Sequence, residues 1–179
     1  MNDLLQGVNI YLIGMMGAGK TTIGKRLSKK LSYRFSDTDT AIEAIARTKI
    51  SEIFAIEGET YFRELETKVL SELSIYTRCV VSTGGGIVEK RTNWSYLRQG
   101  LIIWLNTDLE ILRKRLASDT NRPLASKLET LFTSRYPLYA QADLTIDIDT
   151  NRSPDDIADK IVEMIPSVLK LQSPINNQT

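Results

Sequence analysis

The feature of this sequence that most restricts its fold is a phosphate-binding loop between a strand and a helix. Residues 14–21 read Gly-Met-Met-Gly-Ala-Gly-Lys-Thr, which fits the pattern G-x-x-x-x-G-K-[ST]. Residues 8–13, just before it, are apolar and β-branched, as in a buried strand. After the loop, Ile23, Leu27 and Leu31 recur among basic side chains and predict an amphipathic helix. These flanks favour a nucleoside triphosphate site over a plain turn.

The residue types of this loop define its chemistry. Glycines let successive backbone N–H groups turn inward around a polyphosphate, and the N-terminus of the next helix adds partial positive charge. The side chain of Lys20 can reach the β- and γ-phosphates, and the Thr21 hydroxyl can ligate Mg²⁺. The expected nucleotide contacts here are Gly17, Ala18, Gly19, Lys20, Thr21 and Thr22.

Composition excludes several classes of function. The chain has no histidine, which removes Ser-His-Asp and Cys-His catalysis and zinc sites built on histidine. Its 23 Lys and Arg balance 22 Asp and Glu, and no basic arm indicates binding to nucleic acid or to a membrane surface. A single cysteine, Cys79, excludes a disulfide framework and favours a reducing compartment.

Length and hydropathy predict one cytoplasmic domain. A chain of 179 residues is enough for a single α/β domain with a core, here residues 1–179. The first residues are too few and too polar for a signal peptide, and no apolar run approaches the length of a membrane span.

Strand-like and helix-like segments alternate along the chain. Alternation of this kind predicts a parallel sheet, here of about five strands, with helices on both faces in a three-layer α/β/α fold. The expected strands are residues 8–13, 33–39, 79–82, 101–105 and 143–148. The first expected helix follows the phosphate loop, and a second covers 40–57 with Ile42, Ile45, Ile53 and Phe54 in the core. Further helices are expected to begin at Gly58, to cover 93–99 and to begin at a Thr107 cap. The last two are expected to cover 127–142, with a break near Pro137, and to begin at Ser153.

Two motifs at expected strand ends could carry chemistry. Asp37 and Asp39 place two carboxylates on the same side of an extended segment, one suited to Mg²⁺ and one to a substrate hydroxyl; alternatively they only cap a loop. The three glycines at 84–86 indicate close backbone approach or positive φ, or simply a tight turn. Because ligands of parallel sheets bind beyond the carboxyl ends of the strands, both motifs and the phosphate loop should meet in one cleft.

Two further motifs lie on expected helices. Arg63 and Glu66 are three residues apart, so they should share a face away from the apolar stripe and could be only a surface ion pair. Residues 135–139, Arg-Tyr-Pro-Leu-Tyr, could be only an irregular helix end. Residues 118–125 are polar and lack periodicity, which predicts an exposed loop.

Taken in order, these motifs resemble the shikimate kinase family. The likeness runs from about Ile10 to Pro154. It covers the phosphate loop 14–21, Asp37-x-Asp39, the substrate-helix motif Phe62-Arg63-x-x-Glu66, the glycine triplet 84–86, the lid Arg122-Pro123-Leu124, the carboxylate-binding motif Arg135-x-Pro137-Leu138-Tyr139 and the adenine loop 149–154. As in that family, Ser82-Thr83 stands where many P-loop proteins have an aspartate.

The resemblance implies a P-loop kinase fold with a mobile lid at about 118–125, a substrate-binding helical region at about 39–75 and a frayed tail from about 172. It implies phosphoryl transfer from MgATP to the 3-hydroxyl of shikimate, in aromatic amino acid biosynthesis, by a monomer without nucleic-acid or membrane partners. Implied catalytic residues are Lys20, Asp39 and Arg122, and implied metal ligands are Thr21 and Asp37. Implied nucleotide contacts beyond the loop are Arg115, Arg122 and Arg152, and implied substrate contacts are Asp39, Arg63, Glu66, Gly84, Gly85, Gly86 and Arg135.

The residues fit this chemistry without the resemblance. Arg63 and Arg135 are the side chains that fork-shaped recognition of a carboxylate needs, and Asp39 can accept hydrogen bonds from substrate hydroxyls and orient the attacking one. Two alternatives stay open. Another small-molecule kinase, such as one for gluconate, shares the phosphate loop but does not need paired arginines beside Asp39. A non-catalytic nucleotide-binding module is the other, although the N-K-x-D motif of switch GTPases is absent and Lys20 is present.

Overall fold

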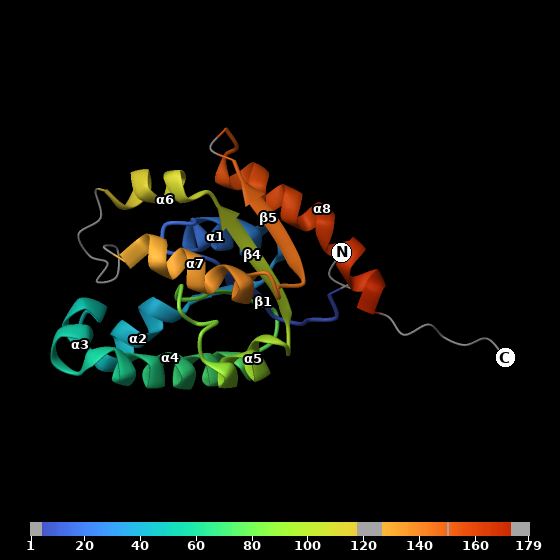
Figure 1. Cartoon of the computed structure of the whole chain (residues 1–179). Helices are drawn as coiled ribbons and strands as arrows, with labels where there is room; N and C mark the ends of the chain where they lie inside the picture. Colours follow the sequence, from blue (N-terminus) through green and yellow to red (C-terminus); the bar gives the residue numbers. More distant parts are fainter. Residues whose placement is uncertain (1–4, 118–126, 150, 173–179) are drawn as a thin grey trace.

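Five parallel strands form one sheet in the order β2-β3-β1-β4-β5 (Figure 1). The structure is a computed structural model that describes residues 5–117, 127–149 and 151–172, so the expected lid with Arg122 and nearly all of the expected tail lie outside it. The strands are β1 (Ile10–Ile13), β2 (Arg34–Asp37), β3 (Cys79–Ser82), β4 (Leu101–Thr107) and β5 (Leu144–Ile148). The expected α/β fold with a parallel sheet is confirmed.

Helices connect the strands. They are α1 (Lys20–Leu31), α2 (Thr38–Ala46), α3 (Ile50–Ile56), α4 (Gly58–Ser74), α5 (Arg91–Leu97), α6 (Leu109–Leu116), α7 (Leu128–Tyr139) and α8 (Pro154–Gln172). In Figure 1, α4 and α5 lie at the bottom, and α6 and the beginning of α8 lie at the top. In the described part of the chain, no helix is both long and apolar enough to cross a membrane.

Both faces of the sheet are covered, as the uniformly buried strands β1 and β3 require. On one face, Gly24 of α1 lies so close to Leu12 and Phe35 that a Cβ there would be 2.7 Å from the Phe35 ring. Trp104 of β4 pairs with Ile13, the residue after Leu12. The Trp104 side chain therefore points to the face of the sheet opposite to Leu12 and α1. There it stacks on Tyr139 of α7, with ring centroids 5.9 Å apart. The edge strand β5 alternates buried and exposed residues, as expected.

Helices α2, α3 and α4 have a small core of their own, separate from the main one. It consists of Ile42, Ile53, Phe62 and Val69. Phe54 of α3 packs against it, with its ring centroid 4.8 Å from that of Phe62. Ile45 was expected in this core, but it is 50% exposed because the core forms on the Ile42 side of α2.

Asp37 and Asp39 do not lie on one extended segment, which corrects the sequence-based expectation. Strand β2 ends at Asp37, and its carboxylate caps α2 by accepting hydrogen bonds from the backbone N–H groups of Asp39 (3.1 Å) and Thr40 (3.2 Å). Asp39 therefore belongs to the first turn of α2. The alternative that the two aspartates only cap the following segment is correct for Asp37, which caps α2.

Two other helix boundaries differ from expectation. Strand β4 continues through Thr107, and the cap of α6 is Asp108, whose side chain accepts from the backbone N–H of Glu110 at 2.8 Å. Helix α7 is not broken at Pro137 and continues to Tyr139. Proline removes one backbone donor, and so near the end of a helix it costs a single bond of the last turn.

Candidate functional site

A cleft of about 370 Å³ lies where the carboxyl ends of the strands meet. The phosphate loop and the first turn of α1 form one side of it, and Asp37, Asp39, Thr83 and Gly85 form another. These segments are far apart in the sequence. They meet because β1, β2 and β3 are parallel and end at the same edge of the sheet. The expected convergence of the phosphate loop, both aspartates and the glycine triplet on one cleft is what the fold produces.

The phosphate loop has the backbone that its glycines allow. Gly14, Gly17 and Gly19 have φ values of 140°, 81° and 94°, a region that other residues rarely adopt. The Lys20 side chain folds back over the loop, and its ammonium group donates to the carbonyl oxygens of Gly14 (2.7 Å) and Met15 (2.8 Å). Lys20 is buried, so its charge is held next to the loop that would bind phosphates.

A hydroxyl and a carboxylate meet beside this loop. The Thr21 hydroxyl donates to Asp37 Oδ2 at 2.7 Å and lies 3.3 Å from the Ser82 hydroxyl. Mg²⁺ prefers such oxygen ligands and commonly combines one or two protein groups with substrate phosphates and water. The described residues contain no cluster of three or more His, Cys, Asp or Glu that could hold a metal alone. Thr21 and Asp37 therefore fit a cation that is shared with bound phosphates.

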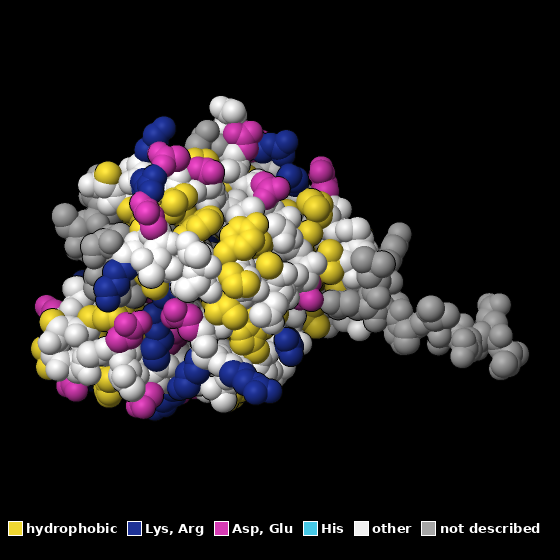
Figure 2. Space-filling model, viewed as in Figure 1, with side chains coloured by type: hydrophobic (Ala, Val, Ile, Leu, Met, Phe, Trp, Pro, Cys, Tyr) yellow, Lys and Arg dark blue, Asp and Glu magenta, His cyan; other side chains and the backbone are white. Residues whose placement is uncertain are grey.

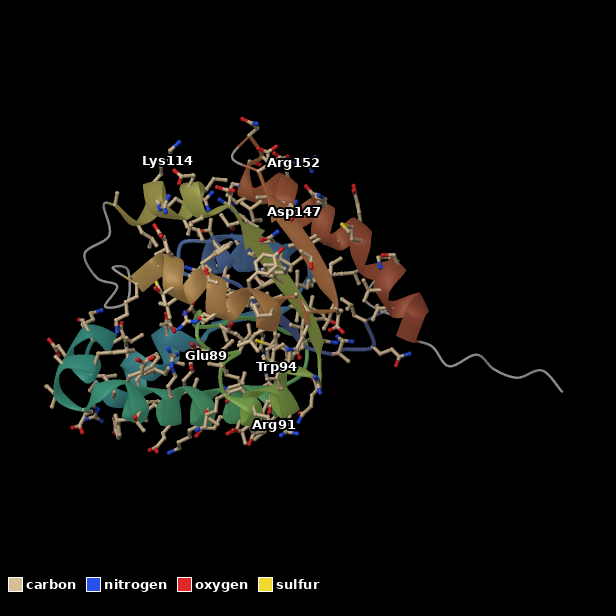
Figure 3. All side chains as sticks on the ribbon, in the orientation of Figure 1. Glu89, Arg91, Trp94, Lys114, Asp147 and Arg152 are labelled. Atoms are coloured by element: carbon tan, nitrogen blue, oxygen red, sulfur yellow. The ribbon has the colours of Figure 1, made fainter. Side chains whose placement is uncertain are left out.

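Two arginines from different helices converge next to the cleft. Arg63 of α4 and Arg135 of α7 are both paired with the carboxylate of Glu89, at 3.5 Å and 3.0 Å. Figure 3 shows Glu89 between these two helices. Arg135 is only 1% exposed, and its Nε has no hydrogen-bond partner among the described residues. In Figure 2, basic and acidic side chains lie side by side where α4 and α7 approach each other, whereas hydrophobic side chains gather toward β4 and β5.

Glu66 is fully buried, which rules out the alternative that it forms only a surface ion pair with Arg63. Its Oε2 accepts from Arg63 Nη1 at 2.9 Å, and its Oε1 has no partner among the described residues. Burial raises the pKa of Glu66 to about 7, with a further upward contribution from Asp39, while Arg63 and Arg135 act in the opposite direction. The side chain points toward the glycine triplet instead of solvent.

The glycine triplet is required for close approach and not for positive φ. None of the residues 84–86 has positive φ. A Cβ on Gly84 would lie 2.5 Å from Glu66 Oε1 and 3.0 Å from Asp39 Oδ1, and one on Gly86 would lie 2.4 Å from the Arg63 guanidinium. The missing side chains of the triplet thus allow Glu66, Asp39 and Arg63 to pack directly against its backbone.

Gly86→Ala should therefore damage the site more than the fold. The three atoms nearest to the added methyl group all belong to the flexible end of Arg63, so we expect Arg63 to be displaced while the chain still folds. The expected result is about a tenfold weaker Kd for an anionic substrate, because a carboxylate loses one of its two cations. Calorimetric titration measures the Kd, and Tm serves as the control. A large fall in Tm together with unchanged binding would contradict this role of Gly86.

Arg115 and Arg152 lie at the other end of the cleft, near Ile148 and Pro154. Arg115 Nη1 donates to the carbonyl oxygen of Gly17 at 3.0 Å, which attaches α6 to the phosphate loop. Arg152 lies in the turn that leads into α8 (Figure 3). Cationic planes beside apolar side chains can accommodate a planar base. Of the residues given a role in catalysis or binding from the sequence, Arg122 lies outside the described residues, together with Pro123 and Leu124 of its motif.

Three residues of the site were not assigned a role from the sequence. The Thr38 hydroxyl accepts from the backbone N–H of Gly84 at 2.9 Å, and the Tyr139 hydroxyl donates to the carbonyl oxygen of Gly85. Glu89 links the two arginines. Thr38 lies inside Asp37-x-Asp39 and Tyr139 inside the Arg135 motif, so both had a local signal. Glu89 had none beyond its place shortly after the triplet.

The chain is similar to one family along most of its length. The family model described as shikimate kinase matches residues 16–166. The shikimate kinase of Rippkaea orientalis (strain PCC 8801 / RF-1) is 54% identical over 173 residues, which are 93% of this chain and 92% of the relative. That of Trichormus variabilis (strain ATCC 29413 / PCC 7937) is 53% identical over 95% of this chain and 97% of its own. A solved structure of shikimate kinase from Acinetobacter baumannii in complex with shikimate has a TM-score of 0.88 at 39% identity and covers 92% of this chain and 96% of its own.

Proposed function

The chain belongs to the shikimate kinase family, and from this premise we propose how its residues transfer the γ-phosphoryl group of ATP to the 3-hydroxyl of shikimate. Membership of the family makes the chain a phosphotransferase with ATP as co-substrate. The observation that carries the proposal is the convergence of Arg63 and Arg135 beside Asp39, at the edge of the phosphate-loop cleft.

ATP binds along the phosphate loop. Backbone N–H groups of Gly17 to Thr22 surround its phosphates, and Lys20 leaves the carbonyl oxygens of the loop to neutralise the β- and γ-phosphates. The adenine lies between Arg115 and Arg152. The hydroxyl of Thr21 and the carboxylate of Asp37 would hold Mg²⁺ at this position. When bound, this ion neutralises charge on the phosphoryl oxygens.

Shikimate binds with its carboxylate against Arg63 and Arg135. Both guanidinium groups have donors in planar arrays, which suit a two-oxygen anion. The backbone of Gly84, Gly85 and Gly86 lies alongside, and Glu66 holds Arg63 from the buried side. Because Asp39 lies next to Gly84, its carboxylate accepts hydrogen bonds from the ring hydroxyls and orients the one that attacks.

Transfer then depends on position and electrostatics, with little covalent chemistry for the protein to do. Lys20 stabilises charge on the transferring group, and Asp39 directs the attacking oxygen and accepts its proton. Arg122, which lies outside the described residues, is the second cation that the family resemblance implies for the transferring group. We place the enzyme in the cytoplasm. We also propose that it is a monomer, and light scattering on purified protein measures this oligomeric state.

The test is ADP release with MgATP over a panel of shikimate, quinate and gluconate, with the product identified by mass. We expect turnover with shikimate and none with gluconate. Turnover of gluconate while shikimate is inert would overturn the proposal and favour the other small-molecule kinase. ADP release that does not depend on an acceptor would leave only an ATPase.

The affinity for shikimate should fall as the pH rises from 6 to 8. Glu66 has a pKa of about 7 and is faced by Arg63, Arg135 and Asp39. Its protonated form leaves the arginines available to the substrate, whereas its ionised form neutralises Arg63 and repels the incoming carboxylate. The substrate carboxylate itself, with an ordinary pKa of about 4, is ionised at both pH values. We expect a Kd several-fold weaker at pH 8.

Titration of shikimate at fixed ionic strength measures this dependence. Glu66→Gln, which cannot ionise, should bind with nearly the same Kd at both pH values. If wild type and Glu66→Gln show the same pH dependence, another group is responsible.

A further inference from the structure

Glu89 occupies a position that its sequence neighbourhood does not explain. It follows the glycine triplet in a turn, where its backbone N–H donates to the carbonyl oxygen of Gly86 at 3.0 Å. One carboxylate oxygen, Oε2, lies 3.0 Å from Arg135 Nη2 and 3.5 Å from Arg63 Nη2. A single oxygen therefore lies between two guanidinium groups that come from different helices (Figure 3).

We propose that Glu89 is a specificity-determining residue whose carboxylate stands in for the substrate carboxylate between Arg63 and Arg135 and moves away when the substrate binds. The inference rests on the proposed function, because it concerns the carboxylate of that substrate.

The pairing of Glu89 is incomplete, and this favours exchange. Oε2 alone contacts the arginines, and Arg135 Nε has no partner among the described residues. A donor buried without a partner is costly, so a carboxylate that engages two donors of one guanidinium is a better partner than Glu89. A substrate carboxylate is not tied to the backbone and can adopt that geometry.

The three side chains differ in their freedom to move. The Arg135 side chain is 1% exposed and that of Arg63 is 15% exposed, whereas that of Glu89 is 35% exposed and already contacts solvent. If Glu89 stayed, the substrate carboxylate would join Glu59, Glu66 and Glu89 around the same two cations, and the negative charges would repel one another. Glu89 is therefore the group that swings outward, while the arginines keep their places.

This exchange makes the site selective. A ligand with a carboxylate replaces Glu89 on the two arginines. A ligand without one would have to leave the Glu89 pairs intact or leave the buried Arg135 without its carboxylate partner, whereas Arg63 would keep Glu59 and Glu66. Glu89 thus weakens the affinity for every ligand that must displace it, and it weakens the affinity for uncharged ligands most.

The test compares Glu89→Gln with Glu43→Gln. Glu43 is a matched control because it is similarly exposed, at 31%, and is also ion-paired, but its partner is Lys49 and neither of the two arginines. Each protein is titrated with shikimate and with shikimate methyl ester, without nucleotide, by calorimetry. For Glu89→Gln we expect a shikimate Kd roughly three- to tenfold tighter than wild type, because a partly exposed charged competitor is removed. We expect no comparable gain for the ester, which has no ionised carboxylate.

Other outcomes separate the inference from the proposed function. A weaker Kd in Glu89→Gln would mean that Glu89 only positions the arginines, and an unchanged Kd would make it a bystander; either result overturns the inference. Glu89→Asp, whose shorter side chain cannot span both arginines, should also bind more tightly, and it keeps the test valid if the amide variant folds poorly. If wild type itself neither binds nor phosphorylates shikimate, the proposed function fails instead.

Discussion

Replacing Asp39 with asparagine should lower kcat by about 10²–10⁴-fold, the range that general-base assistance contributes. The amide is close in size and can still accept a hydrogen bond, but it carries no negative charge and cannot take the proton of the attacking hydroxyl. Asp39 lies in the first turn of α2 and lines the cleft, and its Oδ1 lies next to the glycine triplet. We expect the dissociation constants of ATP and shikimate to change by less than about fivefold, because charge and proton transfer matter most in the transition state.

Steady-state kinetics with both substrates, together with binding titrations, separates these effects. Asp159→Asn is the matched control: it is the same substitution on the surface of α8, at a residue paired with Lys30 and outside the cleft. A kcat within about threefold of wild type for Asp39→Asn would show that Asp39 neither orients nor deprotonates the hydroxyl.

Arg135→Lys should weaken shikimate binding by about 10- to 150-fold, which corresponds to about 1.5–3 kcal/mol, the contribution of one hydrogen bond to a charged group. Lysine keeps the charge but has a single ammonium group in place of a planar array of donors, so it cannot engage two carboxylate oxygens in parallel. The site gives little room for compensation because Arg135 is 1% exposed and lies 3.0 Å from Glu89. ATP affinity should change by less than about threefold, since Arg135 does not line the phosphate-loop side of the cleft.

Calorimetric titration with each ligand measures both constants, and Tm reports on the buried charge. Arg98→Lys is the control, because Arg98 stacks on Trp94 at the end of α5 and lies away from the cleft. A larger loss of ATP affinity than of shikimate affinity would mean that Arg135 belongs to the nucleotide side.

Locally encoded features of this protein could be predicted from its sequence. The phosphate loop is a run of glycines between a strand and a helix, and it has the positive φ values that such a run permits. Helix α8 begins where Ser153 and Asp156 cap each other, with Ser153 Oγ accepting from the backbone N–H of Asp156 at 3.2 Å. Its stripe of Ile157, Ile161 and Ile165 is buried, as its spacing predicts. Each feature depends on residues within a few positions of one another, so the sequence pattern contains it directly.

The order of strands and helices along the chain also predicts which distant segments come together. Parallel strands end at one edge, so the phosphate loop, Asp37 and the glycine triplet could be assigned to one cleft before any contact was known. The outline of the nucleotide side follows from that rule. The carboxylate side does not, because Arg63 and Arg135 are contributed by helices whose relative placement no local pattern specifies.

Contacts between distant segments decided the rest. The spacing of Arg63 and Glu66 placed both on one helical face, but only the approach of the glycine triplet determines that Glu66 is fully buried, with a pKa of about 7. Glu89 is 26 residues after Arg63 and 46 before Arg135, and it meets both only when α4 and α7 pack around its turn. Burial and charge pairing of this kind depend on atoms from several elements at once. Local patterns and the order of the elements are enough to specify the phosphate loop, the fold class and the edge of the sheet where the site forms, whereas the packing of distant segments sets which charges face one another there.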